Sequence, residues 1–221
     1  TAQALDMAQW GWALSLGFAM LVFVVLLGSI KRIAKVAEAI TPLKGILYLI
    51  CAIIVVCANI GQLPETLSQI VTQAFTAEAA QGGFIGMIAV AFKRASFANE
   101  AGLGSAPIVH AAAKTEVPVR EAAVALLEPF FAAIIALLTG LMVTITGAYA
   151  GASAEDGVLI ASKAFTSVAP WFSVMLAVNV FIFAYSTTIG WSYYGEIAWS
   201  FLFGRRGIKA YYLLFCFATF M

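Results

Sequence analysis

Long apolar runs separated by short polar stretches dominate the hydropathy pattern of this chain. The runs cover about residues 10–30, 43–63, 122–146 and 171–203, and a partial run covers 210–221. A membrane-spanning helix needs about 20 mostly apolar residues, and the four longer runs reach that length. The pattern therefore predicts an all-α integral membrane protein, with the whole chain forming one transmembrane domain.

A further apolar region, residues 82–113, is interrupted in its middle. As a continuous helix of about 32 residues it would be roughly 48 Å long, well beyond a hydrocarbon core of about 30 Å. Gly102, Gly104 and Pro107 lie close together in this middle and weaken the helix there. Because the apolar halves on either side are each too short to span alone, we expect one discontinuous crossing.

Composition supports the membrane class. Hydrophobic residues make up 63% of the chain and charged residues only 10%, against about 45–50% and about 25% in soluble domains. The net charge of +1 gives no indication of a nucleic-acid partner. The three cysteines lie in apolar runs without metal-ligand spacing, so they are interpreted as packing residues.

The ends of the chain also carry information. It opens on Thr1 and stops at Met221 inside an apolar run, and the first long run is not followed by a small-residue cleavage site. These features predict a piece of a longer protein without a signal peptide.

The basic residues are distributed unevenly between the two sides of the membrane. If the spans alternate in direction, one side carries nine basic residues and the other carries only Lys163. The nine are Lys31, Arg32, Lys35, Lys44, Lys114, Arg120, Arg205, Arg206 and Lys209. The positive-inside rule places this basic side in the cytoplasm. Residues 82–113 then cross once, from outside to inside.

The polar middle of the interrupted region is a candidate functional site. Unpaired backbone groups at membrane depth are tolerated only inside protein or beside a water-filled cavity, and transporters use such discontinuous helices to bind ions and substrates. An ordinary loop between two shorter spans is one alternative, and a re-entrant pore loop of a cation channel at residues 93–107 is another. An intramembrane enzyme using Glu100 and His110 as an acid/base pair is a third, but no nucleophile or metal cluster accompanies them.

A second polar patch interrupts the apolar run 171–203. One small, polar face is formed at helical spacing by Ala184, Thr187, Thr188, Trp191, Gly195 and Ala198. Adjacent threonine hydroxyls are hard oxygen ligands of the type that suits a small alkali cation, and Trp191 offers a broad apolar wall. The alternative is close packing, since small and hydroxyl residues commonly form the interfaces of membrane helices.

Three blocks of the sequence carry a family likeness. They are residues 97–107 (FANEAGLGSAP) with 111–114 (AAAK), residues 187–196 (TTIGWSYYGE), and residues 28–34 (GSIKRIA). With them the chain closely resembles the alanine or glycine:cation symporter family, the sodium:alanine symporters, along essentially its whole length. The resemblance implies a leucine-transporter-type bundle built from two inverted five-helix repeats. In that frame, the runs 10–30, 43–63, 82–113, 122–146, 171–203 and 210–221 correspond to helices four to nine.

The resemblance also implies a function and a set of site residues. It implies import of alanine or glycine across the plasma or inner membrane by alternating access, with sodium as the coupling ion and no other cofactor. The Ala184 carbonyl and the hydroxyls of Thr187 and Thr188 would belong to a sodium site. Phe97, Asn99 and Trp191, with Thr187 again, would line the substrate pocket. The missing N-terminal half of the protein would supply the remaining contacts.

Overall fold

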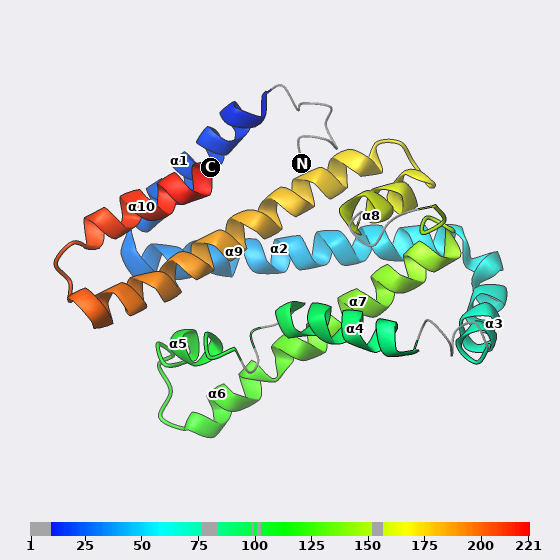
Figure 1. The fold of residues 1–221 in the computed structure, drawn as a ribbon, viewed down its shortest axis with the longest axis horizontal. Helices are drawn as coiled ribbons and strands as arrows, with labels where there is room; N and C mark the ends of the chain where they lie inside the picture. Colours follow the sequence, from blue (N-terminus) through cyan, green and yellow to red (C-terminus); the bar gives the residue numbers. More distant parts are fainter. Residues whose placement is uncertain (1–9, 77–83, 99, 101–102, 152–156) are drawn as a thin grey trace. The chain divides into compact units, whose positions relative to one another are not determined.

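The computed structural model describes residues 10–76, 84–98, 100, 103–151 and 157–221, and all regular structure in these ranges is helical (Figure 1). The helices are α1 (Gly11–Leu26), α2 (Ser29–Ala58), the short 3₁₀ helix η3 (Ile60–Gln62), α3 (Leu63–Ala74), α4 (Phe84–Ala98), α5 (Ala106–His110), α6 (Pro118–Ala125), α7 (Leu127–Ile145), α8 (Gly157–Thr166), α9 (Phe172–Phe203) and α10 (Ile208–Phe220). They form two compact units. The first contains the described residues up to Cys51 together with Phe165–Met221, and the second contains Ala52–Ala164.

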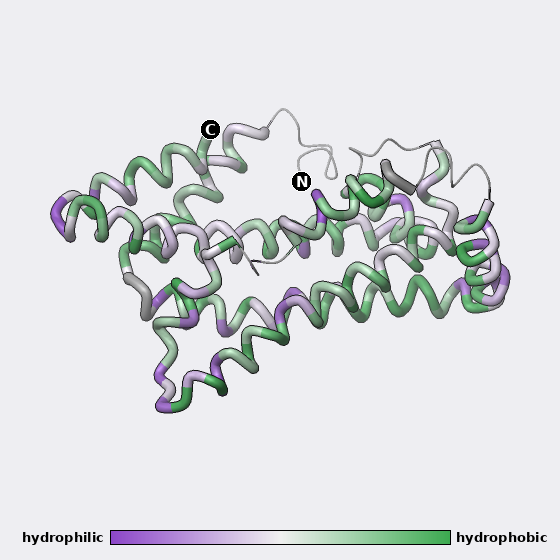
Figure 2. Tube along the Cα trace, turned by 60° about the horizontal axis from the view of Figure 1, so that its bottom comes forward, coloured by the Kyte–Doolittle hydropathy of each residue, from purple (hydrophilic) through white to green (hydrophobic). Residues whose placement is uncertain are grey.

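Three helical stretches in the described parts are long and apolar enough to cross a membrane. They are Arg32–Ala58, Pro118–Ile145 and Phe172–Phe203. In an apolar 18-residue segment of each, only 11%, 0% and 28% of the residues, respectively, are buried inside the protein. Hydrophobic residues line the helices and hydrophilic ones gather near the turns (Figure 2). Exposed apolar surface of this extent requires lipid or further protein beside it, because its contact with water is energetically unfavourable.

Helix α2 begins earlier than the hydropathy pattern suggests. It starts at Ser29, only three residues after α1 ends at Leu26, and it runs through the basic stretch and through Pro42. Proline removes one backbone hydrogen bond there, but the preceding residues are rich in Ala, Lys and Glu, which are strong helix formers. Lys44, which the charge pattern counts on the cytoplasmic side, therefore lies inside this long helix, and its side of the membrane remains a prediction.

The core of the first unit lies where α1, α9 and α10 pack together. Val22 and Leu26 of α1 are almost fully buried against Tyr212 of α10, and Tyr185 of α9 packs against the same cluster. Figure 1 shows α1 and α10 side by side. The turn from α9 into α10 passes through Gly204 at φ +69° and ψ −175°, a conformation that is essentially restricted to glycine.

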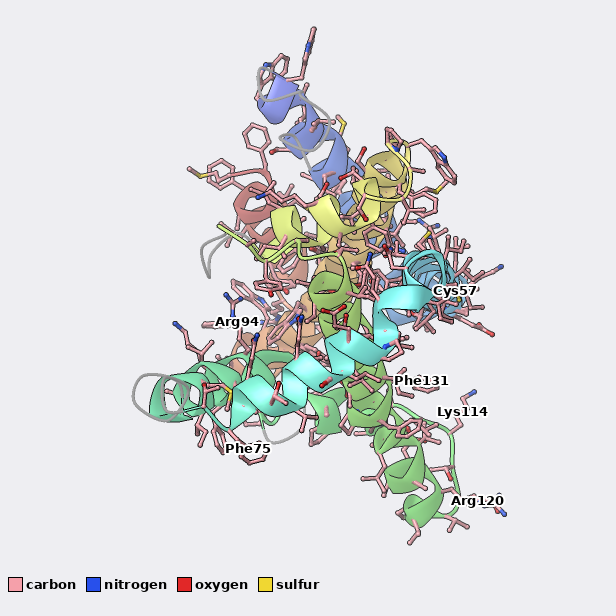
Figure 3. All side chains as sticks on the ribbon, turned by 90° about the vertical axis from the view of Figure 1, so that its right-hand side faces the viewer. Cys57, Phe75, Arg94, Lys114, Arg120 and Phe131 are labelled. Atoms are coloured by element: carbon pink, nitrogen blue, oxygen red, sulfur yellow. The ribbon has the colours of Figure 1, made fainter. Side chains whose placement is uncertain are left out.

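The second unit contains the interrupted region together with α3, α6 and α7. Phe75 after α3 and Phe131 on α7 are 87% and 53% exposed within it, and both side chains can be followed in Figure 3. Lys114 lies before α6 and Arg120 lies in its first turn, and both are labelled in Figure 3. This unit therefore combines apolar exposed helix faces with a charged segment at the start of α6.

Candidate functional site

The interrupted region consists of two helices with a non-helical interval between them. Helix α4 ends at Ala98 and the one-turn helix α5 begins at Ala106. Phe97 lies in the last turn of α4, but its side chain and the whole of Asn99 fall outside the described residues. Their assignment to a substrate pocket remains a prediction, as does the crossing of the membrane by this region as one unit.

A carboxylate from the following helix contacts the backbone where α4 ends. The backbone N–H of Glu100 donates a hydrogen bond to Glu128 Oε1 at 3.1 Å. Glu128 lies in the first turn of α7. A carboxylate that accepts a backbone N–H forms a charge-assisted bond, which is stronger than a neutral one. The contact ties the chain just after α4 to the first turn of α7.

The last residues before α5 combine an unusual backbone with a buried hydroxyl. Gly104 has φ +86°, which a residue with a side chain adopts only with strain. Ser105 is 8% exposed, and its hydroxyl has no hydrogen-bond partner among the described residues. An unpaired buried hydroxyl is costly.

A second carboxylate contacts the end of α5. His110 Nδ1, at the end of α5, lies 2.6 Å from Glu121 Oε1 in the first turn of α6, and both side chains are about one-quarter exposed. His110 is thus paired with Glu121. The acid/base pair weighed from the sequence joined His110 to Glu100 instead. Carboxylates of the α6–α7 region consequently bind the chain on both sides of the interruption.

The candidate sodium ligands lie on one turn of α9. Thr188 Oγ1 donates a hydrogen bond to the Ala184 carbonyl at 2.8 Å. The hydroxyl proton is therefore directed back along the helix, which leaves the oxygen lone pairs of Thr188 available to a cation. Ala184 and Thr187 are exposed within the first unit. Oxygen donors of the hard type that alkali cations prefer thus meet on one accessible side of a continuous helix.

Trp191 follows one turn later on the same side. It is 47% exposed, and its ring packs edge-on against Tyr194 with 5.4 Å between centroids. The exposed part of the indole is a broad apolar surface next to the hydroxyl turn. Such a surface can bound a pocket for a small side chain, and the role of Trp191 in substrate binding stays a prediction.

Helix α9 is anchored to its neighbours in the first unit. Tyr185 donates to the Leu21 carbonyl on α1 at 3.0 Å, and Tyr211 on α10 donates to the Ser192 carbonyl at 2.8 Å. Gly195 lies directly against the Tyr211 hydroxyl, where a Cβ atom would collide with it. These contacts fix the rotation of α9. Gly195, one turn after Trp191 on the same face, meets α10, whereas Ala184, Thr187 and Trp191 are exposed.

A cavity of about 570 Å³ lies beside this turn but has a different chemical character. Its walls come from α1, α9 and α10 and include Phe18, Phe181 and Ala184, with Ser15 and Thr219 as hydroxyl groups. A zwitterionic amino acid needs polar partners for both its amino and carboxylate groups. This cavity alone does not offer them.

The structure adds three residues that the sequence interpretation missed. Lys44 Nζ donates to Ser186 Oγ at 2.6 Å, and the buried Asn179 donates from Nδ2 to the Lys44 carbonyl at 3.1 Å. Ser186 lies within the polar patch but was assigned no role. A lysine and an asparagine inside apolar runs were the available signals, because polar residues in membrane helices face protein rather than lipid.

The predicted site residues fall into two groups that the structure describes separately. Ala184, Thr187, Thr188 and Trp191 belong to the first unit, and Phe97 and Asn99 belong to the second. The first group shares one helical face. The joining of the two groups into one pocket remains a prediction.

Comparisons with known proteins agree on one family. The model of the sodium:alanine symporter family matches residues 1–221. The sodium/alanine symporter AgcS of Methanococcus maripaludis is 37% identical over 210 residues, which cover 92% of this chain and 46% of the relative. The sodium/proton-dependent alanine carrier protein of Bacillus sp. PS3 is 31% identical over 213 residues, covering 87% and 48%. The amino-acid carrier protein AlsT of Bacillus subtilis is 32% identical over 180 residues, covering 80% and 38%. The chain thus spans less than half the length of these curated relatives.

Proposed function

The chain belongs to the sodium:alanine symporter family, and from that premise we propose that the whole protein imports alanine or glycine together with sodium by alternating access. The family is one of multi-pass membrane transporters and not of enzymes, and its coupling ion is sodium. The proposed location is the plasma or inner membrane, where an inward sodium gradient can drive uptake.

One observation carries this proposal for the chain itself. The turn from Ala184 to Thr188 places the hydroxyls of Thr187 and Thr188 beside the Ala184 carbonyl, which accepts the Thr188 hydroxyl, and Ala184 and Thr187 are exposed. Neutral oxygen ligands without a carboxylate suit a monovalent cation that must bind and then leave. Trp191 on the same face supplies an apolar wall for a small side chain.

The interrupted region supports the same function. Its non-helical interval lies between α4 and α5, and Glu128 and Glu121 bind the chain on its two sides. Discontinuous helices in transporters expose backbone carbonyls and N–H groups to ions and to the charged groups of a substrate. We propose that Phe97 and Asn99 face the amino acid from this interval, with Thr187 between substrate and sodium.

The proposed architecture is the leucine-transporter type, in which this chain supplies about helices four to nine. A second discontinuous helix in the missing N-terminal half would complete the site. The relatives are more than twice as long as the matched region, which leaves room for such a half.

Uptake measurements on the full-length protein in proteoliposomes test this function. Labelled alanine and glycine should enter only with an inward sodium gradient, and small neutral amino acids should compete with the label. Asn99→Ala should reduce uptake with little change in sodium dependence. Uptake that ignores sodium, or that no small neutral amino acid inhibits, would contradict the proposal.

A cation channel with a re-entrant loop at residues 93–107 is the alternative that this experiment also addresses. A channel would give single-channel currents that do not saturate with amino acid. A symporter should instead show saturable, substrate-dependent charge movement.

A further inference from the structure

Lys44 places a positive charge against α9 in the first unit. It lies in α2, within the stretch Arg32–Ala58 that is long and apolar enough to cross a membrane, and its side chain is half-buried. A charged group in such a helix is costly and usually faces the protein interior, where it acts on ions or substrates. The position of its ammonium therefore calls for a functional explanation.

The contacts of the ammonium come from one face of α9. Lys44 Nζ donates to Ser186 Oγ at 2.6 Å and lies 4.7 Å from the centre of the Phe183 ring. Ser186 in turn donates to the Phe183 carbonyl at 3.0 Å, so its hydroxyl serves one donor and one acceptor role. No carboxylate of the described residues lies within ion-pairing distance of the ammonium. Its charge is thus held by a hydroxyl and a ring, neither of which neutralises it.

The backbone of Lys44 is fixed to the same face. Asn179, which is 3% exposed, donates from its amide to the Lys44 carbonyl at 3.1 Å. Asn179, Phe183 and Ser186 follow the i, i+4, i+7 spacing of one helical face. Lys44 is therefore held against α9 through both its backbone carbonyl and its ammonium, which restricts its side chain to this position.

The bound turn is the one that carries the candidate sodium ligands. Ser186 lies between Ala184 and Thr187 in sequence, and at 100° per residue it faces nearly away from Thr188. The ammonium and a sodium ion bound at Thr188 would therefore lie on opposite sides of α9, about 10 Å apart. At an effective dielectric constant near 20 or somewhat higher, two unit charges at that distance weaken binding by roughly 3- to 20-fold.

We propose that the Lys44 ammonium, held by Ser186 on the back of the α9 turn, lowers the sodium affinity of the Ala184–Thr188 site. The proposal rests on the proposed function, because it assumes the sodium site on this turn. Its physical purpose is release: a transported ion must bind tightly enough to enter and weakly enough to leave. Lys44 is accordingly an affinity-determining residue that does not touch the ion.

Equilibrium binding of radioactive sodium to the purified full-length protein tests this inference without requiring transport. Lys44→Met removes the charge and keeps an unbranched chain, whereas Lys44→Arg keeps the charge. Lys44→Met should bind sodium roughly 3- to 20-fold more tightly than wild type, and Lys44→Arg should stay within about twofold of it. Lys44→Gln provides a second neutral variant if Lys44→Met does not fold.

The outcomes separate this inference from the proposed function. If the wild-type protein binds no sodium, the proposed function fails and the inference fails with it. If the wild type binds sodium but the neutral variants bind it with unchanged or weaker affinity, only the role of Lys44 is overturned. A merely structural role for Lys44 would shift Lys44→Arg and Lys44→Met in the same direction, which also overturns the proposal.

Discussion

At the scale of single residues, the hydroxyl of Thr188 shows how a continuous helix can offer ligands to a cation. The hydroxyl donates to the Ala184 carbonyl at 2.8 Å, and this local bond is common for threonine in membrane helices. The same bond orients the oxygen so that its lone pairs point away from the helix axis. Local backbone bonding and cation binding are therefore compatible at this residue.

Replacing Thr188 with alanine should lower the apparent affinity for sodium. The variant loses one oxygen ligand, so the sodium concentration for half-maximal uptake should rise about tenfold or more. Thr188→Ser keeps the hydroxyl and should stay close to wild type. Sodium titrations of alanine uptake by the full-length protein measure both.

Thr144 provides the matched control. Its hydroxyl also donates to the carbonyl four residues earlier, Gly140, at 2.8 Å on α7. Thr144→Ala should leave the sodium requirement unchanged. An equal effect of both substitutions would mean that the lost backbone bond, and not a lost ligand, is responsible.

At the scale of elements, the interval between α4 and α5 depends on conformations that most residues avoid. Gly104 has φ +86°, and a Cβ atom added there would meet no other atom within 4 Å. Any cost of a side chain at this position is therefore conformational and not a collision. Contacts from Glu128 and Glu121 on either side then hold the chain in its interrupted form.

Gly104→Ala should destabilise the protein by about 1–2 kcal/mol, because alanine is strained in the left-handed region. Gly86→Ala is the control within the same region. Gly86 lies inside α4, and a Cβ atom added to it would also meet no other atom within 4 Å, so alanine should be neutral or stabilising by up to about 1 kcal/mol. Unfolding of the purified full-length protein in mixed detergent micelles measures both changes. Equal stability of the two variants would argue against a strained Gly104.

At the scale of the whole molecule, the charge distribution predicts how the chain crosses the membrane. The turn with Lys114 and the turn with Arg205 and Arg206 should both face the cytoplasm, and Lys163 should face the outside. Lys114 and Arg120 both lie in the second unit, before and within the first turn of α6. The orientation itself remains a prediction.

Cysteine labelling of the full-length protein in intact cells tests this topology. The native Cys51, Cys57 and Cys216 are first replaced by serine, and single cysteines are then placed at Lys163 and at Arg206. A membrane-impermeant maleimide should label the first site in intact cells and the second only after permeabilisation. The reverse pattern would overturn the orientation, and labelling of both sites in intact cells would overturn the span count between them.

Much of the local structure could be predicted from the sequence. The helical, membrane-embedded class follows from apolar runs of spanning length, and the weak point near Gly104 follows from backbone restrictions on glycine and proline. The boundary between the first two helices could not be predicted as well. Hydropathy predicts which residues can contact lipid, but it does not predict where a helix begins. Helix α2 continues through the basic stretch because Ala, Lys and Glu favour helix.

The sequence by itself therefore determined the membrane class, the position of the interruption and the turn proposed to carry the oxygen ligands, because each depends on neighbouring residues. The tertiary structure decided which distant groups meet. Lys44 and Ser186 are 142 positions apart, and Glu100 and Glu128 are 28 apart. A hydropathy pattern shows that a polar residue needs a partner, but only the packing of the helices brings that partner within hydrogen-bonding distance.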